Sequence, residues 1–218
     1  MSLIDISPPL HPGIGVWPGD TPMSREVLVA FEGGGNLELS TLRSTVHLGA
    51  HADAPSHYRA GAADISTRAL DRYYGPCEVV TVDVAPGARI LPSDLPGPVQ
   101  APRVLLRTGS FPDPDVFNTD FAALSPELVA HLHQQGVRLI GIDTPSVDPF
   151  DSKALESHQA LADRDMAVLE GLVLEHVDPG AYTLIALPLR LVGFDASPVR
   201  AALLPATQVP APLPGSGE

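Results

Sequence analysis

The chain has 218 residues, and 44% of them are hydrophobic, so it is long enough to fold as one large domain with a full core or as two small ones. Its 13 Lys and Arg residues against 26 Asp and Glu residues give a formal net charge of −13 at pH 7. This balance argues against a nucleic-acid or an anionic-membrane partner, because both require an excess of Lys and Arg.

The cysteine content and the N-terminus indicate a cytoplasmic protein. The single cysteine, Cys77, cannot form a disulfide within the chain, which fits a reducing compartment. It stands at the start of the run CEVVTVDV, which is typical of a buried strand, so we interpret it as a core residue and not as a nucleophile. The N-terminal sequence MSLIDISPPL lacks the basic-then-apolar pattern of a signal peptide, and no apolar run approaches the ~18 residues of a membrane span.

Short strands and proline-containing loops alternate along the first half of the chain and recur in the second. The N-terminal region holds two loop signatures, Ser7-Pro8-Pro9 and the sequence WPGDTP at residues 17–22. Six segments rich in Val, Ile, Leu or Thr and bounded by Gly, Pro or Asp are predicted strands. They are Glu26–Phe31, Leu37–Val46, Cys77–Val84, Arg103–Arg107, Val137–Ile142 and Tyr182–Pro188.

Two helices are predicted in the second half of the chain. The first covers Pro126–Gln135, because Ser125 can cap its N-terminus, Pro126 suits its first turn and Gly136 suits a left-handed stop. The second covers Ser152–Ala162.

The order of these elements favours one domain. The chain has no internal repeat and no obvious linker between two halves. We therefore predict a single α/β domain over residues 1–204, with flanking helices around a mixed sheet that curls. Residues 205–218 are rich in Pro, Gly, Ala and Ser and are predicted to form a disordered tail.

The most informative segment is VHLGAHADAPSH at residues 46–57, which holds three histidines and an aspartate in the spacing H-x3-H-x-D-x3-H. Imidazole and carboxylate groups are the usual ligands of zinc and neighbouring divalent metals. His47 and His51 have the spacing of one helical face, but the intervening glycine and the following proline argue against a helix. In an extended strand, residues four apart stand about 13 Å from each other, too far to share an ion. We therefore predict a strand that ends in a tight loop, bends at Gly49, and binds a metal through His47, His51 and Asp53.

This set of three ligands is incomplete. It leaves a fourth position for water, which is what a catalytic metal site needs. Asp53 has two oxygens and could bridge to a second ion, for which His158 and Glu170 are candidates because each interrupts apolar surroundings. Spacing alone leaves those two assignments open, and it leaves His57 as either a surface histidine or a part of the chemistry.

The residues around this motif are similar to those of a known family. The sequence HLGAHADAPSHY resembles the signature of the metal-dependent cyclase-like hydrolases, and most closely that of the bacterial kynurenine formamidases (arylformamidases). Ala50 stands where the wider family often has threonine, as in the formamidase branch. The resemblance covers nearly the whole chain up to about Leu204. Other similar segments are WPGDTP at 17–22, LLRTGS at 105–110, GIDTPSVDPFDSK at 141–153, ESH at 156–158, LEGL at 169–172 and LIALPLRLVGFDASPVRA at 184–201.

The resemblance implies an α/β fold around a mixed, barrel-like sheet, a homodimer, and a site for two zinc ions. The ligands that it implies are His47, His51, Asp53, His158 and Glu170. By position, Asp53 would bridge the two ions, and His57 would be the proton-transfer residue. The same N/O ligand set also suits manganese or cobalt.

The activity implied by the resemblance is hydrolysis of N-formyl-L-kynurenine to L-kynurenine and formate, a step of tryptophan breakdown. The departing aromatic amine needs a proton as the C–N bond breaks, and His57, with an unperturbed pKa of about 6.5, is the natural donor. Trp17, the only tryptophan, lies in a Pro/Gly loop. It could form a wall for the aromatic substrate, or it could anchor the loop on the core.

Two other functions stay open at this point. A sister hydrolase would open a cyclic amide such as isatin, with the same metals and a different pocket. A metal-binding protein without catalysis, such as a sensor or store, would favour closed ligand shells and would leave His57 without a role. The Ser-His-Asp formamidases are excluded, because the chain has no G-x-S-x-G sequence.

Overall fold

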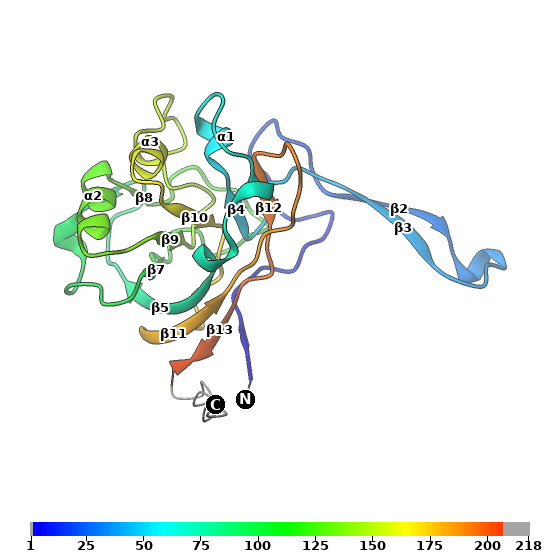
Figure 1. Ribbon diagram of the computed structural model, residues 1–218. Coiled ribbons are helices and arrows are strands. Elements are labelled where there is room, and N and C mark those ends of the chain that lie inside the picture. The colour runs from blue at the N-terminus through cyan, green and yellow to red at the C-terminus, as the bar shows by residue number, and fades with distance from the viewer. Residues whose placement is uncertain (1, 207–218) are drawn as a thin grey trace, which may run out of the picture.

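The computed structural model describes residues 2–206, and most of their strands belong to one sheet. The strands of this sheet are β1 (Ile4–Asp5), β4 (His51–Asp53), β5 (Tyr74–Thr81), β7 (Arg103–Arg107), β9 (Leu139–Ile142), β10 (Ala167–Glu170), β11 (Gly180–Ile185), β12 (Ala196–Pro198) and β13 (Ala202–Pro205). Their order is β1-β13-β11-β5-β7-β9-β10-β4-β12. Neighbours from β5 to β10 are parallel, and the outer pairs on both sides are antiparallel. Figure 1 shows that the sheet curls, so the predicted α/β domain around a mixed, curled sheet is confirmed.

The helices are few and short. They are α1 (Pro55–Tyr58), α2 (Pro126–Gln134) and α3 (Glu156–Asp163), with 3₁₀ turns at η1 (Phe31–Gly33), η2 (Ile65–Thr67), η3 (Leu70–Arg72) and η4 (Pro92–Asp94). Two further strands, β6 (Arg89–Ile90) and β8 (Ala123–Leu124), form a small parallel pair.

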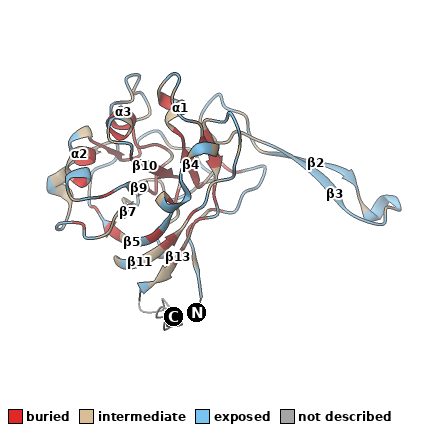
Figure 2. Ribbon diagram, in the orientation of Figure 1, coloured by how far each residue is buried: buried red, intermediate tan, exposed pale blue. Residues whose placement is uncertain are grey.

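The core consists of two apolar clusters, one on each face of the sheet. Successive residues of a strand point to opposite faces, so Leu105 joins one cluster while Val104 and Leu106 join the other. The second cluster also contains the buried faces of α2 and α3, which Figure 2 shows in red against that side of the sheet. The two helices therefore cover one face, and the site described below lies where α3 meets the sheet.

The first predicted helix is confirmed, and it ends one residue earlier than predicted, at Gln134. The Ser125 hydroxyl oxygen accepts a hydrogen bond from the Leu128 N–H at 3.0 Å, and Gly136 has a φ of +89° just after the helix. The second helix was predicted to begin at Ser152, and this start is wrong. Leu155 has a φ of +48°, outside the helical region, so α3 begins only at Glu156.

The predicted strands are present, and all except β7 have ends that differ from the predicted ones. The strand β3 (Leu39–Arg43), for example, stops before the predicted end at Val46, because the chain then enters the bends around His47. The sequence did not indicate β4, β10 and β12. These strands have three or four residues each, too few to show a two-residue periodicity.

A hairpin of β2 (Ser24–Val29) and β3 projects from the body of the domain (Figure 1). Every residue of both strands is exposed. We call residues 24–43 the arm. An isolated two-stranded hairpin is marginally stable at best in water, so a surface that covers the arm would stabilise it.

The last described strand reaches the first residue of the predicted tail. Pro205, the first residue of the predicted tail, ends β13, and residues 207–218 lie outside the described residues. Among residues 2–206, no helix is both long enough and apolar enough to cross a membrane.

Candidate metal centre and its cavity

The motif of residues 47–57 is divided among a turn, a strand and a short helix. His47 lies in a turn, and the chain reverses at Gly49, whose φ is +55°. His51 and Asp53 are the first and last residues of β4, and His57 is in α1. The predicted bend at Gly49 is confirmed. The predicted order is wrong, because the loop precedes the strand that carries His51 and Asp53.

The sheet register brings distant residues of the chain to this strand. β4 lies between β10 and β12, and His51 stands directly opposite Glu170. Alternation along β4 places Asp53 on the same face as His51. His158, in the first turn of α3, lies over that face, with its Nε2 3.4 Å from Asp53 Oδ2. Strand pairing and helix packing thus unite four residues that span 119 positions of sequence, from 51 to 170.

Four buried polar atoms at this place have no hydrogen-bond partner. They are His51 Nε2, His158 Nε2, Asp53 Oδ1 and Asp53 Oδ2. The side chains of all three residues are at most 3% exposed. A buried polar atom without a partner costs about 1–3 kcal/mol, so four of them together indicate a missing ligand.

The separations of these atoms match the distances between the ligands of one ion. His51 Nε2 lies 3.4 Å from Asp53 Oδ1 and 3.3 Å from Glu170 Oε2. His158 Nε2 lies 3.4 Å from Asp53 Oδ2 and 3.3 Å from Glu170 Oε1. A tetrahedral ion with bonds of about 2.0–2.1 Å holds its ligand atoms about 3.3 Å apart. The residues present therefore fit a divalent cation.

Each histidine that could bind metal has its second ring nitrogen held by an oxygen. These partners are the Gly49 carbonyl for His51 (2.8 Å), Asp148 Oδ2 for His158 (2.9 Å) and Asp195 Oδ2 for His47 (3.1 Å). Because these oxygens accept, the facing ring nitrogen carries a proton, and in the neutral ring the other nitrogen keeps its lone pair. These contacts thus orient the rings as a metal ligand needs.

The two oxygens of Asp53 face different histidines. Oδ1 lies 3.0 Å from His47 Nδ1 and 3.4 Å from His51 Nε2, whereas Oδ2 faces His158. The carboxylate thus presents one oxygen to each side of the cluster.

Opposite charges dominate the electrostatics of the cluster. Burial raises the pKa of Asp53, but the adjacent imidazoles of His47 and His158 outweigh burial and hold this pKa well below its usual range. Burial lowers the pKa of His47, and the Asp53 and Asp195 carboxylates more than reverse this and raise it to about 10. The buried carboxylates thus favour positive charge beside them, from protons or from a cation.

A cavity of about 520 Å³ opens over this cluster. Its floor includes His47, His51, His158 and Glu170, and His57 also lines it. Trp17, Phe111 and Phe117 line it as well, and Trp17 stacks on Phe150 with ring centroids 5.0 Å apart. Trp17 therefore both faces the cavity and packs against other aromatic rings. Among residues 2–206, no Lys or Arg lines this cavity.

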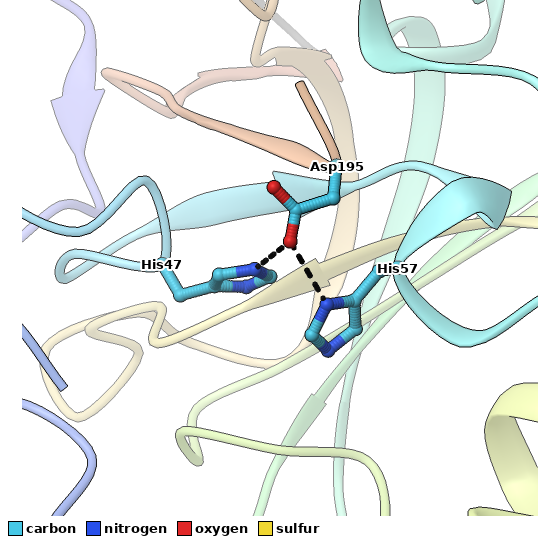
Figure 3. A group of neighbouring side chains, drawn as sticks. All are labelled: His47, His57 and Asp195. Atoms are coloured by element: carbon cyan, nitrogen blue, oxygen red, sulfur yellow. Dashed lines mark hydrogen bonds and ion pairs between the residues drawn. The ribbon is translucent and has the colours of Figure 1, made fainter. Parts of the chain in front are cut away.

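His57 lies at the rim of the cluster. One of its ring nitrogens is within 4.8 Å of ligand atoms of Asp53 and His158, and its side chain is 32% exposed. Its Nδ1 is 3.2 Å from Asp195 Oδ2, the same oxygen that His47 contacts (Figure 3).

Sequence reasoning missed Asp148 and Asp195. Both lie in segments that resemble the hydrolase family, but neither has a spacing that links it to the motif of residues 47–57. Their contacts come from the packing of the folded chain. The sequence separation is 10 residues between Asp148 and His158, and 148 residues between Asp195 and His47.

Two glycines pack the loop of the motif against β10. Gly171 has a φ of +65°, and a Cβ atom added to it would collide with the carbonyl oxygen of Gly49. That carbonyl is the acceptor that orients His51. The absence of a side chain at position 171 thus contributes to the geometry of the cluster.

The remaining histidines and the cysteine lie outside the cavity. His133 is exposed, and His131 is half-buried beside Gln135. His11 contacts Asp115, and His176 donates to the Asp5 carbonyl. Cys77 is 1% exposed within β5, so the prediction that it is a core residue is confirmed.

Known proteins resemble this chain over most of its length. Residues 4–149 match the Cyclase family model. A solved structure described as a potential metal-dependent hydrolase with cyclase activity is 27% identical, with a TM-score of 0.78 over 93% of this chain and 96% of its own. A "predicted metal-dependent hydrolase from Bacillus stearothermophilus" gives the same identity and TM-score over 93% and 97%. Isatin hydrolase A from Labrenzia aggregata, bound to benzyl benzoate, has 21% identity and a TM-score of 0.78 over 93% of each chain, a likeness that shows the fold alone.

Proposed function

The chain belongs to the Cyclase family, and from this premise we propose that it is a metal-dependent amide hydrolase acting on N-formyl-L-kynurenine. The products would be L-kynurenine and formate. The observation that carries the metal requirement is the set of four buried polar atoms without partners on His51, Asp53 and His158. Divalent cations held among these atoms would satisfy them.

We assign the metal ligands to two ions that share Asp53. The orientation of its two oxygens supports this assignment, since Oδ1 faces His47 and His51 while Oδ2 faces His158, with Glu170 beside it. Zinc suits these N/O ligands, and manganese or cobalt are the alternatives. When bound, the ions supply Lewis acidity at the amide carbonyl and make water acidic enough to attack near neutral pH.

His57 would donate a proton to the leaving group. After water adds to the formyl carbon, the C–N bond breaks and the aromatic amine departs, which is difficult without a proton on its nitrogen. His57 lies at the rim of the cluster, within 4.8 Å of ligand atoms of Asp53 and His158. The aromatic rings of Trp17 and Phe117 would pack against the substrate ring in the cavity.

A cyclic amide such as isatin is the second candidate substrate, and the charge of the cavity favours it. N-formyl-L-kynurenine carries a carboxylate, for which no Lys or Arg is available among the described residues lining the cavity. Isatin carries no such group. Asp20, which lines the cavity, would suit the ammonium group of N-formyl-L-kynurenine instead.

The test measures metal content and hydrolysis on the same preparation. We expect two divalent ions per chain by elemental analysis, formate release from N-formyl-L-kynurenine, loss of activity after chelation, and recovery with zinc or manganese. Faster turnover of isatin would overturn the substrate assignment. Bound metal without turnover of either amide would make the protein a metal binder.

We further propose that the chain forms a homodimer through the arm. Its exposed apolar side chains include Val27, Leu28, Phe31 and Leu42. A second exposed apolar surface lies on the body, in the segment between β11 and β12, and comprises Leu187, Leu189, Val192 and Phe194. In a two-fold dimer the arm of each protomer would cover this surface of its partner. The same arm–body contact would therefore form two times, and the apolar patches of both protomers would be buried.

Light scattering on arm variants tests this dimer. We expect the wild-type mass to be that of a dimer, and Leu28→Asp/Leu42→Asp to give a monomer with an unchanged circular dichroism spectrum. Leu3→Asp is the control, because Leu3 is also 59% exposed but lies outside both surfaces. A monomeric wild type, or dissociation by Leu3→Asp alone, would refute the role of the arm.

A further inference from the structure

Asp195 is a carboxylate in contact with two residues that line the cavity, His47 and His57, and the proposed chemistry does not use it. It directly precedes β12, and its Oδ2 lies between two imidazole rings, 3.1 Å from His47 Nε2 and 3.2 Å from His57 Nδ1 (Figure 3). The two rings are close neighbours, with centroids 4.2 Å apart. One oxygen thus contacts both a candidate metal ligand and the candidate proton donor.

We propose that Asp195 is the positioning residue of His57, holding its ring so that Nε2 is the nitrogen available to the substrate. This inference rests on the proposed function, in which His57 transfers the proton. A carboxylate only accepts hydrogen bonds, so Nδ1 of His57 must carry the proton that Asp195 receives. In the neutral ring this leaves the lone pair on Nε2, and in the protonated ring it leaves Nε2–H as the donor.

The backbone fixes Asp195 relative to the metal cluster. Its carbonyl oxygen accepts a hydrogen bond from the Ala54 N–H at 2.8 Å, and the next residue, Ala196, pairs with Asp53. On its other side, the Phe194 carbonyl accepts from the Ile65 N–H at 3.0 Å. The carboxylate is therefore tied to the strand that carries Asp53, and it can set the position of His57 relative to that residue.

The hydrogen bonding of Asp195 distinguishes it from the metal ligands. His47, His57 and Asp195 also have ligand atoms within 4.8 Å of one another, a grouping that could hold an ion. Here, however, the facing atoms are hydrogen-bonded to each other, and the Asp195 side chain is 44% exposed. By contrast, the atoms of His51, Asp53 and His158 that face one another are buried and without partners. The contrast favours a positioning role for Asp195, and metal binding is the alternative for the test.

The test combines metal content, steady-state kinetics and a double-mutant cycle with N-formyl-L-kynurenine as substrate. We expect Asp195→Asn to keep the wild-type metal content and KM while kcat falls about 10- to 100-fold, the usual effect of losing such a partner. In the His57→Ala background the same substitution should change kcat by less than about 3-fold, because its effect passes through His57. Asp64→Asn is the matched control. The Asp64 carboxylate accepts a hydrogen bond from the Gly193 N–H, in the same β11–β12 segment as Asp195, but Asp64 lies outside the cavity. Its kcat should stay within about 2-fold of wild type.

Loss of metal from Asp195→Asn would overturn the proposal, because Asp195 would then act as a metal ligand or through the ligand His47, which the same oxygen contacts. Equal effects of the substitution in both backgrounds would also overturn it. The tautomer of His57 gives a measurement that does not depend on activity. It is read from long-range ¹H–¹⁵N spectra of the zinc-loaded protein, in which the His57 ring signals are those that are missing from the spectrum of His57→Ala. We expect the Nδ1–H tautomer in the wild type and its loss in Asp195→Ala, and an Nε2–H tautomer in the wild type would refute the proposal. If neither amide is hydrolysed, the proposed function fails and this tautomer alone decides the role of Asp195.

Discussion

The floor and the rim of the cavity differ in both burial and hydrogen bonding. On the floor, His51, Asp53 and His158 are at most 2% exposed, and each carries a polar atom without a partner. On the rim, the side chain of His57 is 32% exposed and is hydrogen-bonded to Asp195, whose side chain is 44% exposed. Unpaired atoms in a dry site are suited to a cation, whereas a hydrogen-bonded histidine in contact with water is suited to proton transfer. The two layers should therefore respond differently to substitution.

The largest effect is expected on the floor. Asp53→Ala should release metal from both positions, because each of its oxygens faces a different set of histidines. Loss of activity should exceed the ~10²–10⁴-fold contribution of one acid–base group. Elemental analysis measures the metal. The control is Asp143→Asn, another buried carboxylate beside the cavity, which already accepts hydrogen bonds from Thr108 and Gly109 and should keep both ions. Two ions per chain in Asp53→Ala would refute the bridge.

On the rim, His57→Ala should separate activity from metal binding. We expect hydrolysis to fall by ~10²–10⁴-fold while the metal content stays at the wild-type value. His133→Ala is the control, since His133 is exposed on α2 and lies outside the cavity. Near-normal turnover in His57→Ala would remove this residue from the mechanism, and loss of metal would move it to the floor.

A smaller effect is expected at the aromatic side of the rim. Trp17→Ala removes a ring that faces the cavity and stacks on Phe150. An aromatic contact contributes about 0.5–1.5 kcal/mol, so KM for an aromatic amide should rise by about 2- to 10-fold with little change in kcat. Trp17→Phe should restore most of the loss. A change confined to kcat would contradict a role in substrate binding.

The smallest effect is expected at Cys77, which is buried as deeply as the floor residues but lies outside the cavity. Burial raises the pKa of its thiol to about 12, so at pH 8 the reactive thiolate is scarce. We expect no reaction with a disulfide reagent in the folded protein and one thiol per chain after denaturation. Rapid reaction in the folded state would show that burial does not control reactivity in this protein.

The sequence predicts the floor of the site better than its rim. His47, His51 and Asp53 lie within seven residues, so their spacing alone suggests metal binding. His158 and Glu170 rest on the family resemblance, because their proximity depends on the β4–β10 register and on the packing of α3. Neither feature shows in local periodicity, since β4 and β10 have three and four residues.

Asp195 shows the limit of local reasoning. It reaches His57 across 138 positions, through the pairing of β12 with β4. The helix α2 is the opposite case, because its cap at Ser125 and its stop at Gly136 are local and are read directly from the chain. The start of α3 was misplaced because the left-handed φ of Leu155 has no signal in residue type.

The close packing of Gly171 on the Gly49 carbonyl sets a rule for redesign of this scaffold. Any larger residue at position 171 must displace the loop whose carbonyl orients His51, so a change there would damage metal binding whatever it gained elsewhere. The aromatic side of the cavity carries no such restriction. A library aimed at new amide substrates should therefore keep the two glycines fixed and randomise Trp17, Phe111 and Phe117 instead.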